Sequence, residues 1–501
     1  PLNELIKKTK TSQSSVNGLV KRNLVEVFDK EIERVFTTSY QEENKPLTLS
    51  VQQDKIIDRV SETIENNSFE PFLLHGVTGS GKTQVYIELT KKVVEKSKDV
   101  IILVPEISLT PQITTRFLNQ FGDIVTVLHS RMSLGERYDS WRGIISGKYK
   151  VVIGPRSALF APLKNIGLIV VDEEHDQSYK QNDIVPKYNA RDSAVIRAKF
   201  CNCPVLLGSA TPSLESMYNA LNNKYILLEL PERIDNAQLP IIKLVDLTIE
   251  KKKKRMESVF SKTLLDEIGT RIEKKESIII LQNRRGFATQ VYCNDCGEVI
   301  TCGDCSVPMV HHLNKNILQC HYCNLARTVP KACPLCGSIS LKFFGTGTQR
   351  VEDELEFYFP KSRIARIDSD SISKRGKLGE ILNNFRNGEI DVLVGTQMVA
   401  KGLDFSNVTL VGVISAETTL WIPDFRADER TFQLLTQVAG RSGRSEKKGE
   451  VVIQTQNSKN FVLQKVLEND YAGFYKKEIE LRTQGEYPPF TRIGLIEIKD
   501  E

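Results

Sequence analysis

The chain has 501 residues, of which 40% are hydrophobic and 26% charged, and its formal net charge is +5. This length predicts about three or four domains, and the small charge excludes a protein that is basic over its whole surface. We found no run of about 18 apolar residues and no signal peptide, so no membrane span is expected.

Residues 1–45 predict a small, mostly helical unit. Apolar residues recur at helical spacing on both sides of a polar run at 10–15, and residues 24–28 then predict a short strand. The order helix, turn, helix, strand resembles the end of a winged-helix domain, so this unit is interpreted as a partial winged helix. The alternative is a set of plain packing elements.

Residues 46–235 predict the first α/β domain. Short apolar runs of the buried-strand type alternate with helical stretches, which is typical of a parallel sheet with helices on both faces. The predicted strands cover residues 71–75, 100–104, 124–128, 151–153, 168–171 and 205–207.

A second α/β domain is expected after a linker that contains the charge run 251–255. Residues 236–291 are assigned to this linker and the start of the domain, 292–337 to an inserted cysteine module, and 338–501 to the remainder and a C-terminal segment. The predicted strands cover residues 278–281, 364–367, 392–394, 410–414 and 450–454. Residue 1 is not Met, and the apolar residues at 493–498 predict an unfinished strand, so native segments are expected beyond both ends.

Residues 76–83 match the pattern of a phosphate-binding loop between a strand and a helix. Glycines let backbone N–H groups surround a phosphate, and the predicted glycines for this role are Gly76, Gly79 and Gly81. Lys82 is expected to reach the β- and γ-phosphates of ATP, and Thr83 to bind Mg²⁺ through its hydroxyl.

Two acidic residues follow the predicted strand 168–171. Asp172 is expected to hold Mg²⁺ through water, and Glu173 to orient or deprotonate the attacking water. Arg441 and Arg444, in residues 437–444, have a spacing suited to reach a γ-phosphate across a gap between domains. The predicted catalytic residues are therefore Lys82, Asp172, Glu173, Arg441 and Arg444.

These segments, in this order, resemble motifs of the superfamily 2 helicases. Further segments that carry this resemblance are residues 103–112, 154–157, 208–212, 395–398 and 401–405. The resemblance implies two RecA-like motor domains over residues 47–455, with ATP between them. Gln53 resembles the glutamine that contacts adenine, and Gly402, Asp404 and Gln437 are expected to bind the nucleotide. Arg156 and Thr396 are expected to contact a nucleic-acid strand.

Eight of the ten cysteines form four Cys-x-x-Cys pairs, which predict two closed, structural Zn²⁺ sites. A nested arrangement would place the outer two pairs on one ion and the inner two on the other, but spacing alone leaves other pairings open. The predicted ligands are Cys293, Cys296, Cys302, Cys305, Cys320, Cys323, Cys333 and Cys336. His311, His312 and His321 are interpreted as surface or packing residues.

A cysteine module at this place resembles the bacterial family of primosomal replication-restart helicases (PriA), in which the pairs nest. Further matching segments are residues 128–130, 141–147, 282–287, 345–352, 421–430 and 487–490. Residues 176–192 resemble the family's aromatic-rich loop, in which aromatic rings stack on bases and cations hold phosphates. The predicted DNA contacts there are Tyr179, Lys180, Tyr188 and Arg191.

The resemblance implies an ATP-dependent 3′→5′ DNA helicase that unwinds stalled forks and promotes primosome assembly. It also implies single-stranded and forked DNA, single-strand-binding protein and other primosome proteins as partners, in the bacterial cytoplasm at the nucleoid. Three alternatives stay open: a translocase that does not unwind, a binding module with an idle motor, and an RNA helicase, because backbone contacts discriminate poorly between DNA and RNA.

Overall fold

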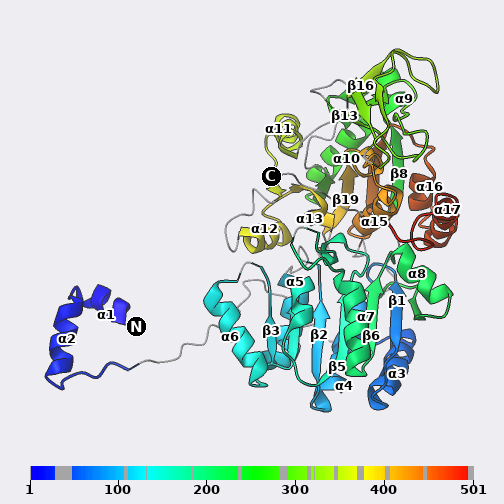
Figure 1. The fold of residues 1–501 in the computed structure, drawn as a ribbon. Coiled ribbons are helices and arrows are strands. Elements are labelled where there is room, and N and C mark those ends of the chain that lie inside the picture. Colours follow the sequence, from blue (N-terminus) through cyan, green and yellow to red (C-terminus); the bar gives the residue numbers. More distant parts are fainter. Residues whose placement is uncertain are drawn as a thin grey trace.

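The computed structural model describes residues 2–28, 48–105, 111–130, 132–182, 184–234, 240–282, 291–312, 317–320, 322–343, 348–368, 377–400, 405, 407–443 and 448–494. The chain forms two β-sheets, each built of parallel strands, one above the other in the view of Figure 1. A small β-rich module lies beyond the second sheet. Among the described residues, no helix is both long and apolar enough to cross a membrane.

The N-terminal segment contains the two predicted helices but not the predicted strand. Helix α1 covers Leu2–Thr9 and α2 covers Gln13–Lys21, where the Ser12 hydroxyl accepts a hydrogen bond from Ser15 N and caps α2. Residues 24–28 form no strand and are exposed. A strand needs a partner for its backbone groups, and no described strand pairs with this segment. The predicted strand is therefore wrong, and residues 29–45 of the expected winged helix lie outside the described residues.

The first sheet has seven parallel strands in the order β3-β4-β2-β5-β6-β1-β7. All six predicted strands are present, and the seventh, β7, lies at the edge. The strands are β1 Pro71–Gly76, β2 Asp99–Leu103, β3 Val125–Val127, β4 Val151–Gly154, β5 Ile166–Asp172, β6 Val205–Ser209 and β7 Ile226–Leu230.

Helices cover both faces of this sheet because successive strand residues point to opposite sides. Phe72 and Leu74 pack in one core with the helices α3, α4 and α5, whereas Leu73 packs in the other with α6, α7 and α8. The helices are α3 Val51–Glu65, α4 Lys82–Glu95, α5 Pro111–Phe121, α6 Leu134–Ile145, α7 Ala190–Cys201 and α8 Leu214–Leu221. Short 3₁₀ turns occur at Gly122–Ile124, Arg156–Phe160 and Gln177–Tyr179.

The second sheet has six parallel strands in the order β17-β18-β11-β19-β20-β8. The five predicted strands are present. Residues 236–291 were expected to form a linker and the start of this domain, with residues 278–281 as the first strand, but β8 lies earlier in this segment and pairs with β20 along its whole length. The strands are β8 Ile241–Asp246, β11 Ser277–Leu281, β17 Ile364–Ile367, β18 Val392–Gly395, β19 Val408–Val413 and β20 Glu450–Thr455.

Helices also pack on both faces of the second sheet, around two separate apolar cores. A small hairpin, β9 Met256–Glu257 with β10 Phe260–Ser261, lies between the helices α9 and α10. The helices are α9 Leu247–Lys252, α10 Lys262–Glu273, α11 Thr348–Tyr358, α12 Lys377–Arg386, α13 Gln397–Ala400, α14 Glu417–Leu420, α15 Ala427–Ala439, α16 Phe461–Leu467 and α17 Tyr471–Gln484. The final residues predicted as a strand, 495–498, lie outside the described residues.

The cysteine module is inserted between β11 and α11. It begins and ends in an antiparallel pair, β12 Val291–Cys293 with β16 Leu341–Phe343. Between them lies a three-stranded antiparallel sheet of β13 Val310–His312, β14 Ile317–Gln319 and β15 Ala326–Thr328. A small apolar core, with Met309 and Leu318 at its centre, stabilises this module. The module therefore extends somewhat beyond the predicted residues 292–337.

Candidate functional site

The predicted phosphate-binding loop connects β1 to α4. Gly79 and Gly81 have φ angles of +86° and +81°, which explains why glycine occupies both positions. Lys82 starts α4, and its Nζ donates to the carbonyl oxygen of Gly76 at 2.7 Å. The buried Ser80 hydroxyl has no hydrogen-bond partner among the described residues. A helix N-terminus, a lysine amine and a spare hydroxyl suit bound phosphate, so the loop fits ATP.

Gln53 lies against this loop. Its side chain closes a capping box with Ser50 at the start of α3, and its Nε2 donates to the carbonyl oxygen of Ser80 at 3.1 Å. A Cβ atom on Gly81 would collide with the Gln53 amide. Gln53 therefore supports the loop directly. Its predicted contact with adenine stays a prediction.

The two predicted acidic residues lie at the end of β5. Burial and the adjacent Glu173 raise the pKa of Asp172 to about 7, although Tyr86 donates to its Oδ1 at 3.0 Å. The nearby Lys82 opposes this rise only in part, and such a carboxyl pair suits a divalent cation. Burial and the nearby Lys82 lower the pKa of His75 to about 4, so this imidazole is neutral at pH 7.

The second domain reaches these acidic residues through α15. Gln437 Nε2 donates to Glu173 Oε2 at 3.1 Å and lies 3.0 Å from His175 Nε2. His175 Nδ1 lies 2.7 Å from Ser209 Oγ at the end of β6, so an Nδ1-protonated imidazole satisfies both contacts. Gly440 packs on Thr78 of the phosphate loop, where an added Cβ would come within 2.7 Å of the Thr78 side chain. The ATP site is thus closed between the two domains.

Of the remaining residues predicted to contact the nucleotide, some are described in the structure and others are not. Arg441 is buried at the end of α15, and Thr83 lies in the first turn of α4. Gly402, Asp404 and Arg444 lie outside the described residues. No described contact tests their predicted roles.

Two of the predicted DNA contacts are hydrogen-bonded inside the first domain, where Tyr179 is buried and Arg191 is partly exposed. Tyr179 is 1% exposed, and its hydroxyl donates to the carbonyl oxygen of Asp172 at 2.6 Å. Arg191 Nη1 donates to Ser213 Oγ at 2.7 Å and pairs with Glu174 at 3.3 Å. Neither side chain is available to stack on a base or hold a phosphate in this conformation, because both are engaged behind the acidic residues.

The other predicted DNA contacts lie nearer the surface. Lys180 is exposed, and Tyr188 is half-buried against the exposed Phe160 ring, with centroids 5.2 Å apart. Arg156 Nη1 donates to the carbonyl oxygen of Ser178 at 3.2 Å, and Thr396 is partly exposed between β18 and α13. These four residues stay candidates for strand contacts.

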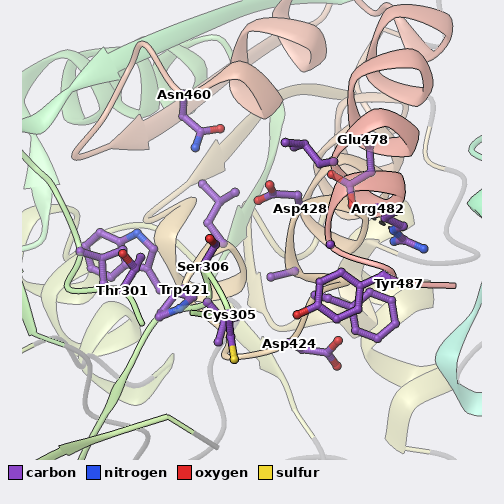
Figure 2. Close-up of a pocket in the computed structure, with 18 of the residues that line it drawn as sticks. Thr301, Cys305, Ser306, Trp421, Asp424, Asp428, Asn460, Glu478, Arg482 and Tyr487 are labelled. Atoms are coloured by element: carbon purple, nitrogen blue, oxygen red, sulfur yellow. Dashed lines mark hydrogen bonds and ion pairs between the residues drawn. The ribbon is translucent and has the colours of Figure 1, made fainter. Parts of the chain in front are cut away.

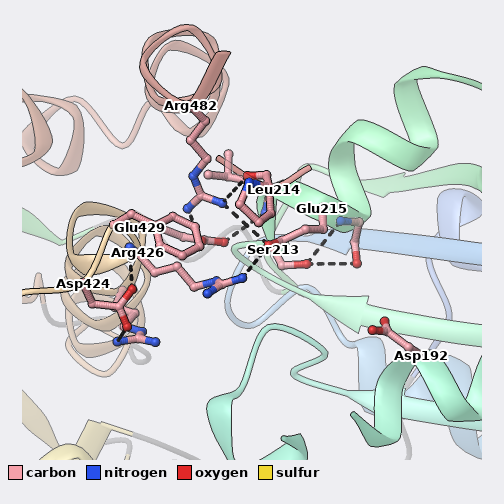
Figure 3. A network of polar contacts seen from close by, with 12 residues as sticks. Asp192, Ser213, Leu214, Glu215, Asp424, Arg426, Glu429 and Arg482 are labelled. Carbon is pink, nitrogen blue, oxygen red and sulfur yellow. Dashed lines mark hydrogen bonds and ion pairs between the residues drawn. The ribbon is translucent and has the colours of Figure 1, made fainter. Parts of the chain in front are cut away.

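A polar network that the sequence did not predict connects the two domains (Figure 3). Glu174, next to the predicted catalytic residue Glu173, accepts hydrogen bonds from Ser213 N at 2.6 Å and Ser216 Oγ at 2.8 Å. Leu214 N then donates across the domain gap to Glu429 on α15 at 3.0 Å. A charged residue in the 421–430 segment was the available signal, but sequence alone does not reveal its partner.

Arg482 on α17 completes the network. It is 1% exposed, pairs with Glu429 at 2.6 Å and Glu478 at 3.1 Å, and lies 3.7 Å from Glu215 of the first domain. The Tyr471 hydroxyl of α17 also donates to the carbonyl oxygen of Pro212 at 2.9 Å. Helix α17 therefore contacts both α/β domains.

The eight cysteines form two four-sulfur groups with the predicted nested pairing. Sulfur–sulfur distances of 3.6 Å for Cys293–Cys336 and 3.7 Å for Cys296–Cys333 are close to the ~3.8 Å edge of a tetrahedral Zn–S₄ centre. The inner group joins Cys302, Cys305, Cys320 and Cys323. The chain therefore has two structural zinc sites. His311 is buried in β13, outside both groups, as expected of a packing residue.

The chain has two α/β domains, each built on a parallel sheet. The first carries a phosphate loop, and a helix of the second closes over the acidic residues of the first. This arrangement defines a two-domain P-loop motor of the helicase type. Family models agree. Residues 46–214 match the res subunit of type III restriction enzymes, residues 341–446 the helicase conserved C-terminal domain, and residues 302–327 the PriA DNA helicase Cys-rich region.

The chain belongs to the PriA family of replication restart proteins. It is 45% identical over its full length to the replication restart protein PriA of Bacillus subtilis, of which it covers 62%, and 42% identical over 89% of its length to that of Rickettsia typhi, of which it covers 70%. The chain thus spans about 60–66% of the length of the first curated relatives that it matches.

Solved structures agree on the fold at low identity. The structure of RecG bound to a three-way DNA junction has a TM-score of 0.51 at 16% identity, and the match covers 89% of this chain and 48% of RecG. The helicase MrfA bound to DNA has a TM-score of 0.50 at 15% identity over 85% of this chain and 48% of MrfA. The predicted fold class, two RecA-like domains with a two-zinc insertion, is confirmed.

Proposed function

We propose that this chain is the motor of an ATP-dependent DNA helicase that moves 3′→5′ and acts at stalled replication forks. The observation that favours this function most is the hydrogen bond from Gln437 of the second domain to Glu173 of the first. A motor needs such a contact, because ATP turnover must change the relation between the domains.

In this proposal each residue has one task. Lys82 holds the β- and γ-phosphates, Thr83 and Asp172 hold Mg²⁺, and Glu173 accepts the proton of the attacking water. Arg441 and Arg444 stabilise negative charge on the γ-phosphate when the domains close. Gln53, Gly402 and Asp404 complete the nucleotide site.

The strand contacts divide into two layers. Arg156, Lys180, Tyr188 and Thr396 contact the DNA backbone and bases directly, since they lie nearer the surface. Tyr179 and Arg191 transmit changes in this loop to Asp172 and Glu174, to which they are hydrogen-bonded. This arrangement gives the loop of residues 176–192 a role in coupling DNA binding to hydrolysis.

The first experiment is ATP hydrolysis with and without single-stranded DNA, compared with Lys82→Ala. We expect strong stimulation by DNA and a loss of about 100-fold or more in the variant, comparable to removing one transition-state stabilising group. Hydrolysis that ignores DNA, or that survives the substitution, contradicts the motor.

Two further assays separate the alternatives. Displacement of a labelled strand from a forked duplex distinguishes a helicase from a translocase, and substrates with a 3′ or a 5′ tail test the direction. The same assays on RNA strands test discrimination between DNA and RNA, for which the 2′-hydroxyl is the recognisable group.

We further propose that the whole protein works with single-strand-binding protein and other primosome proteins at the bacterial nucleoid. The membership in the PriA family supports this assignment. Co-purification of the full-length protein with these partners on forked DNA, but not on intact duplex, is the expected result.

A further inference from the structure

Tyr471, in the first turn of α17, packs against the apolar cores of both α/β domains. The helix itself belongs to the second domain, because Phe474 is 1% exposed there and stacks on Phe432 with ring centroids 4.3 Å apart. The Tyr471 side chain therefore reaches the first domain from a support that is buried in the second. None of the tasks proposed above for ATP hydrolysis uses it.

The ring of Tyr471 lies beside the strand that leads into the phosphate loop. Its centroid is 5.0 Å from that of His75, at an angle of 56°. His75 directly precedes Gly76, the first glycine of the loop, and its imidazole hydrogen-bonds to the backbone of Ala210. Burial and the nearby Lys82 lower the pKa of His75 to about 4, so the tyrosine ring packs on a neutral imidazole at the base of the loop.

The hydroxyl of Tyr471 reaches the segment that follows β6. It donates to the carbonyl oxygen of Pro212 at 2.9 Å, and burial raises the pKa of Tyr471 well above its usual value, so the hydroxyl keeps its proton. The same segment starts at Ser209, whose Oγ lies 2.7 Å from His175, and His175 in turn contacts Gln437 at 3.0 Å. The hydroxyl therefore holds the segment that orients the acidic side of the ATP site.

The other end of α17 lies in a different part of the molecule. Glu478 and Arg482 face a cavity of about 520 Å³ between α17 and the zinc module, where the Tyr487 ring stacks on Phe425 (Figure 2). Helix α17 thus extends from the zinc module to the ATP site, and its first turn, with Tyr471, is the end at the phosphate loop.

We propose that Tyr471 is a positioning residue for ATP hydrolysis, which holds the phosphate loop and the segment 209–212 in place when the domains are closed. Because α17 is part of the second domain, both of its contacts break when the domains separate, so the first domain is held in its active arrangement only in the closed state. This inference rests on the proposed motor function. A misplaced phosphate loop slows the chemical step, because the reacting groups must be held in register.

Two substitutions separate the hydroxyl from the ring. Tyr471→Phe removes the bond to Pro212 and keeps the ring on His75, whereas Tyr471→Leu removes both contacts. With single-stranded DNA present, we expect kcat for ATP hydrolysis to fall about tenfold in Tyr471→Phe, the effect of losing one buried hydrogen bond. We expect a fall of about 100-fold in Tyr471→Leu. The KM for ATP is expected to change by about threefold or less in both variants, because ATP binding does not use Tyr471.

Tyr475→Phe is the matched control. Tyr475 lies one turn later on α17 and packs against the same core of the first domain, but its hydroxyl has no hydrogen bond to any residue that the structure describes. This variant is expected to hydrolyse ATP at the original rate. Urea unfolding and zinc content check that all three variants are folded. Tyr471→Phe removes a single oxygen atom, so it tests the proposal even if the leucine variant does not fold.

A double-mutant cycle with His75→Ala distinguishes positioning from a general loss of stability. If the ring of Tyr471 acts through His75, the kcat of the Tyr471→Leu, His75→Ala double variant is expected to be close to that of Tyr471→Leu alone. Two independent effects would instead multiply.

Three results overturn the proposal in a chain that hydrolyses ATP: an unchanged kcat in both Tyr471 variants, an equal loss of rate in Tyr475→Phe, or effects of Tyr471→Leu and His75→Ala that simply multiply. If the original chain shows no DNA-stimulated hydrolysis, the motor function fails and this inference fails with it. The two failures are distinguishable, because the first is seen only in the variants and the second already in the original chain.

Discussion

Arg482 shows how much a single buried residue stabilises the contact between the domains. It balances the charges of Glu429 and Glu478 and approaches Glu215. We expect Arg482→Gln to destabilise the chain by about 3–5 kcal/mol, because it leaves buried carboxylates without a counter-charge. The measurement is the midpoint of urea unfolding at constant zinc concentration.

A matched control lies on the same helix. Lys477 pairs with Glu480 at 3.1 Å, but both side chains are about half exposed. Replacing Lys477 by Gln is expected to change stability by less than about 1 kcal/mol. If the two variants unfold at the same denaturant concentration, the role assigned to Arg482 is wrong.

Asp172 predicts a pH dependence of metal binding. The fold raises the pKa of Asp172 from 3.8 to about 7, so folding favours the protonated carboxyl. Without metal, the stability that the protonated Asp172 gives to the folded chain is therefore lost as the pH rises from about 4 to 7. Mg²⁺ needs the ionised form, so its affinity increases over the upper part of this range. One pH unit below the pKa, affinity is expected to be about tenfold lower.

This dependence can be measured from the rise in melting temperature that MgADP produces at pH 6 and pH 8. We expect a clearly larger rise at pH 8. Asp172→Asn, which cannot titrate, is expected to show the same small rise at both pH values. A difference between pH 6 and 8 that persists in the variant would assign the titration to another group.

At the scale of elements, the two zinc sites can be separated by mutation. Cys302→Ser should remove one zinc ion, and adding Cys323→Ser should remove no more, because both cysteines belong to the inner site. Combining Cys302→Ser with Cys293→Ser should remove both ions. Zinc content is measured by atomic emission on the purified variants.

Cys203→Ser is the control for this series. Cys203 is buried in the first domain, where burial raises its pKa to about 12, and it is in neither four-sulfur group. Two zinc ions are expected to remain. If the Cys302, Cys323 double variant loses both ions, the pairing is not nested.

The central strands could be predicted from the sequence, but two of the four edge strands, β7 and β8, could not. Strands buried on both faces, such as β2 and β11, are continuous apolar runs that sequence reveals directly. The edge strands β7 and β8 are partly exposed and mix apolar with charged residues. At residues 24–28 a strand was predicted where none forms, because a strand requires a pairing partner as well as apolar residues.

The phosphate loop, the acidic pair and the zinc ligands were predictable because their chemistry depends on residues close together in sequence. Contacts between distant segments were not. Nothing at residue 437 indicates that its amide meets Glu173. Tyr179 was expected to face DNA because residues 176–192 resemble an aromatic-rich DNA-contacting loop, yet such a loop has no periodicity from which burial could be inferred.

At the scale of the whole molecule, the close approach of Gly440 to Thr78 predicts a test of domain closure. Gly440 has an ordinary helical φ of −63°, so Gly440→Ala adds no backbone strain and affects only the space between the domains. We expect the rate of ATP hydrolysis to fall by about 10- to 100-fold, because the second domain is displaced from the proposed catalytic residues.

Gly269→Ala is a suitable comparison. Gly269 lies on α10 of the same domain, and a Cβ there would make an ordinary contact of 3.5 Å with Phe359. We expect this variant to hydrolyse ATP at the original rate. Equal rates for both variants would mean that the closed arrangement is not the active one.

The nesting of the zinc sites has a consequence for the order of events during synthesis. The inner site joins cysteines 21 residues apart and the outer site cysteines 43 residues apart. As the chain leaves the ribosome, the inner ligands are all available first, and their shorter loop costs about 0.6 kcal/mol less to close. The first metal ion bound then shortens the loop left for the second, so the outer ion is the last to bind and fixes the module to the motor.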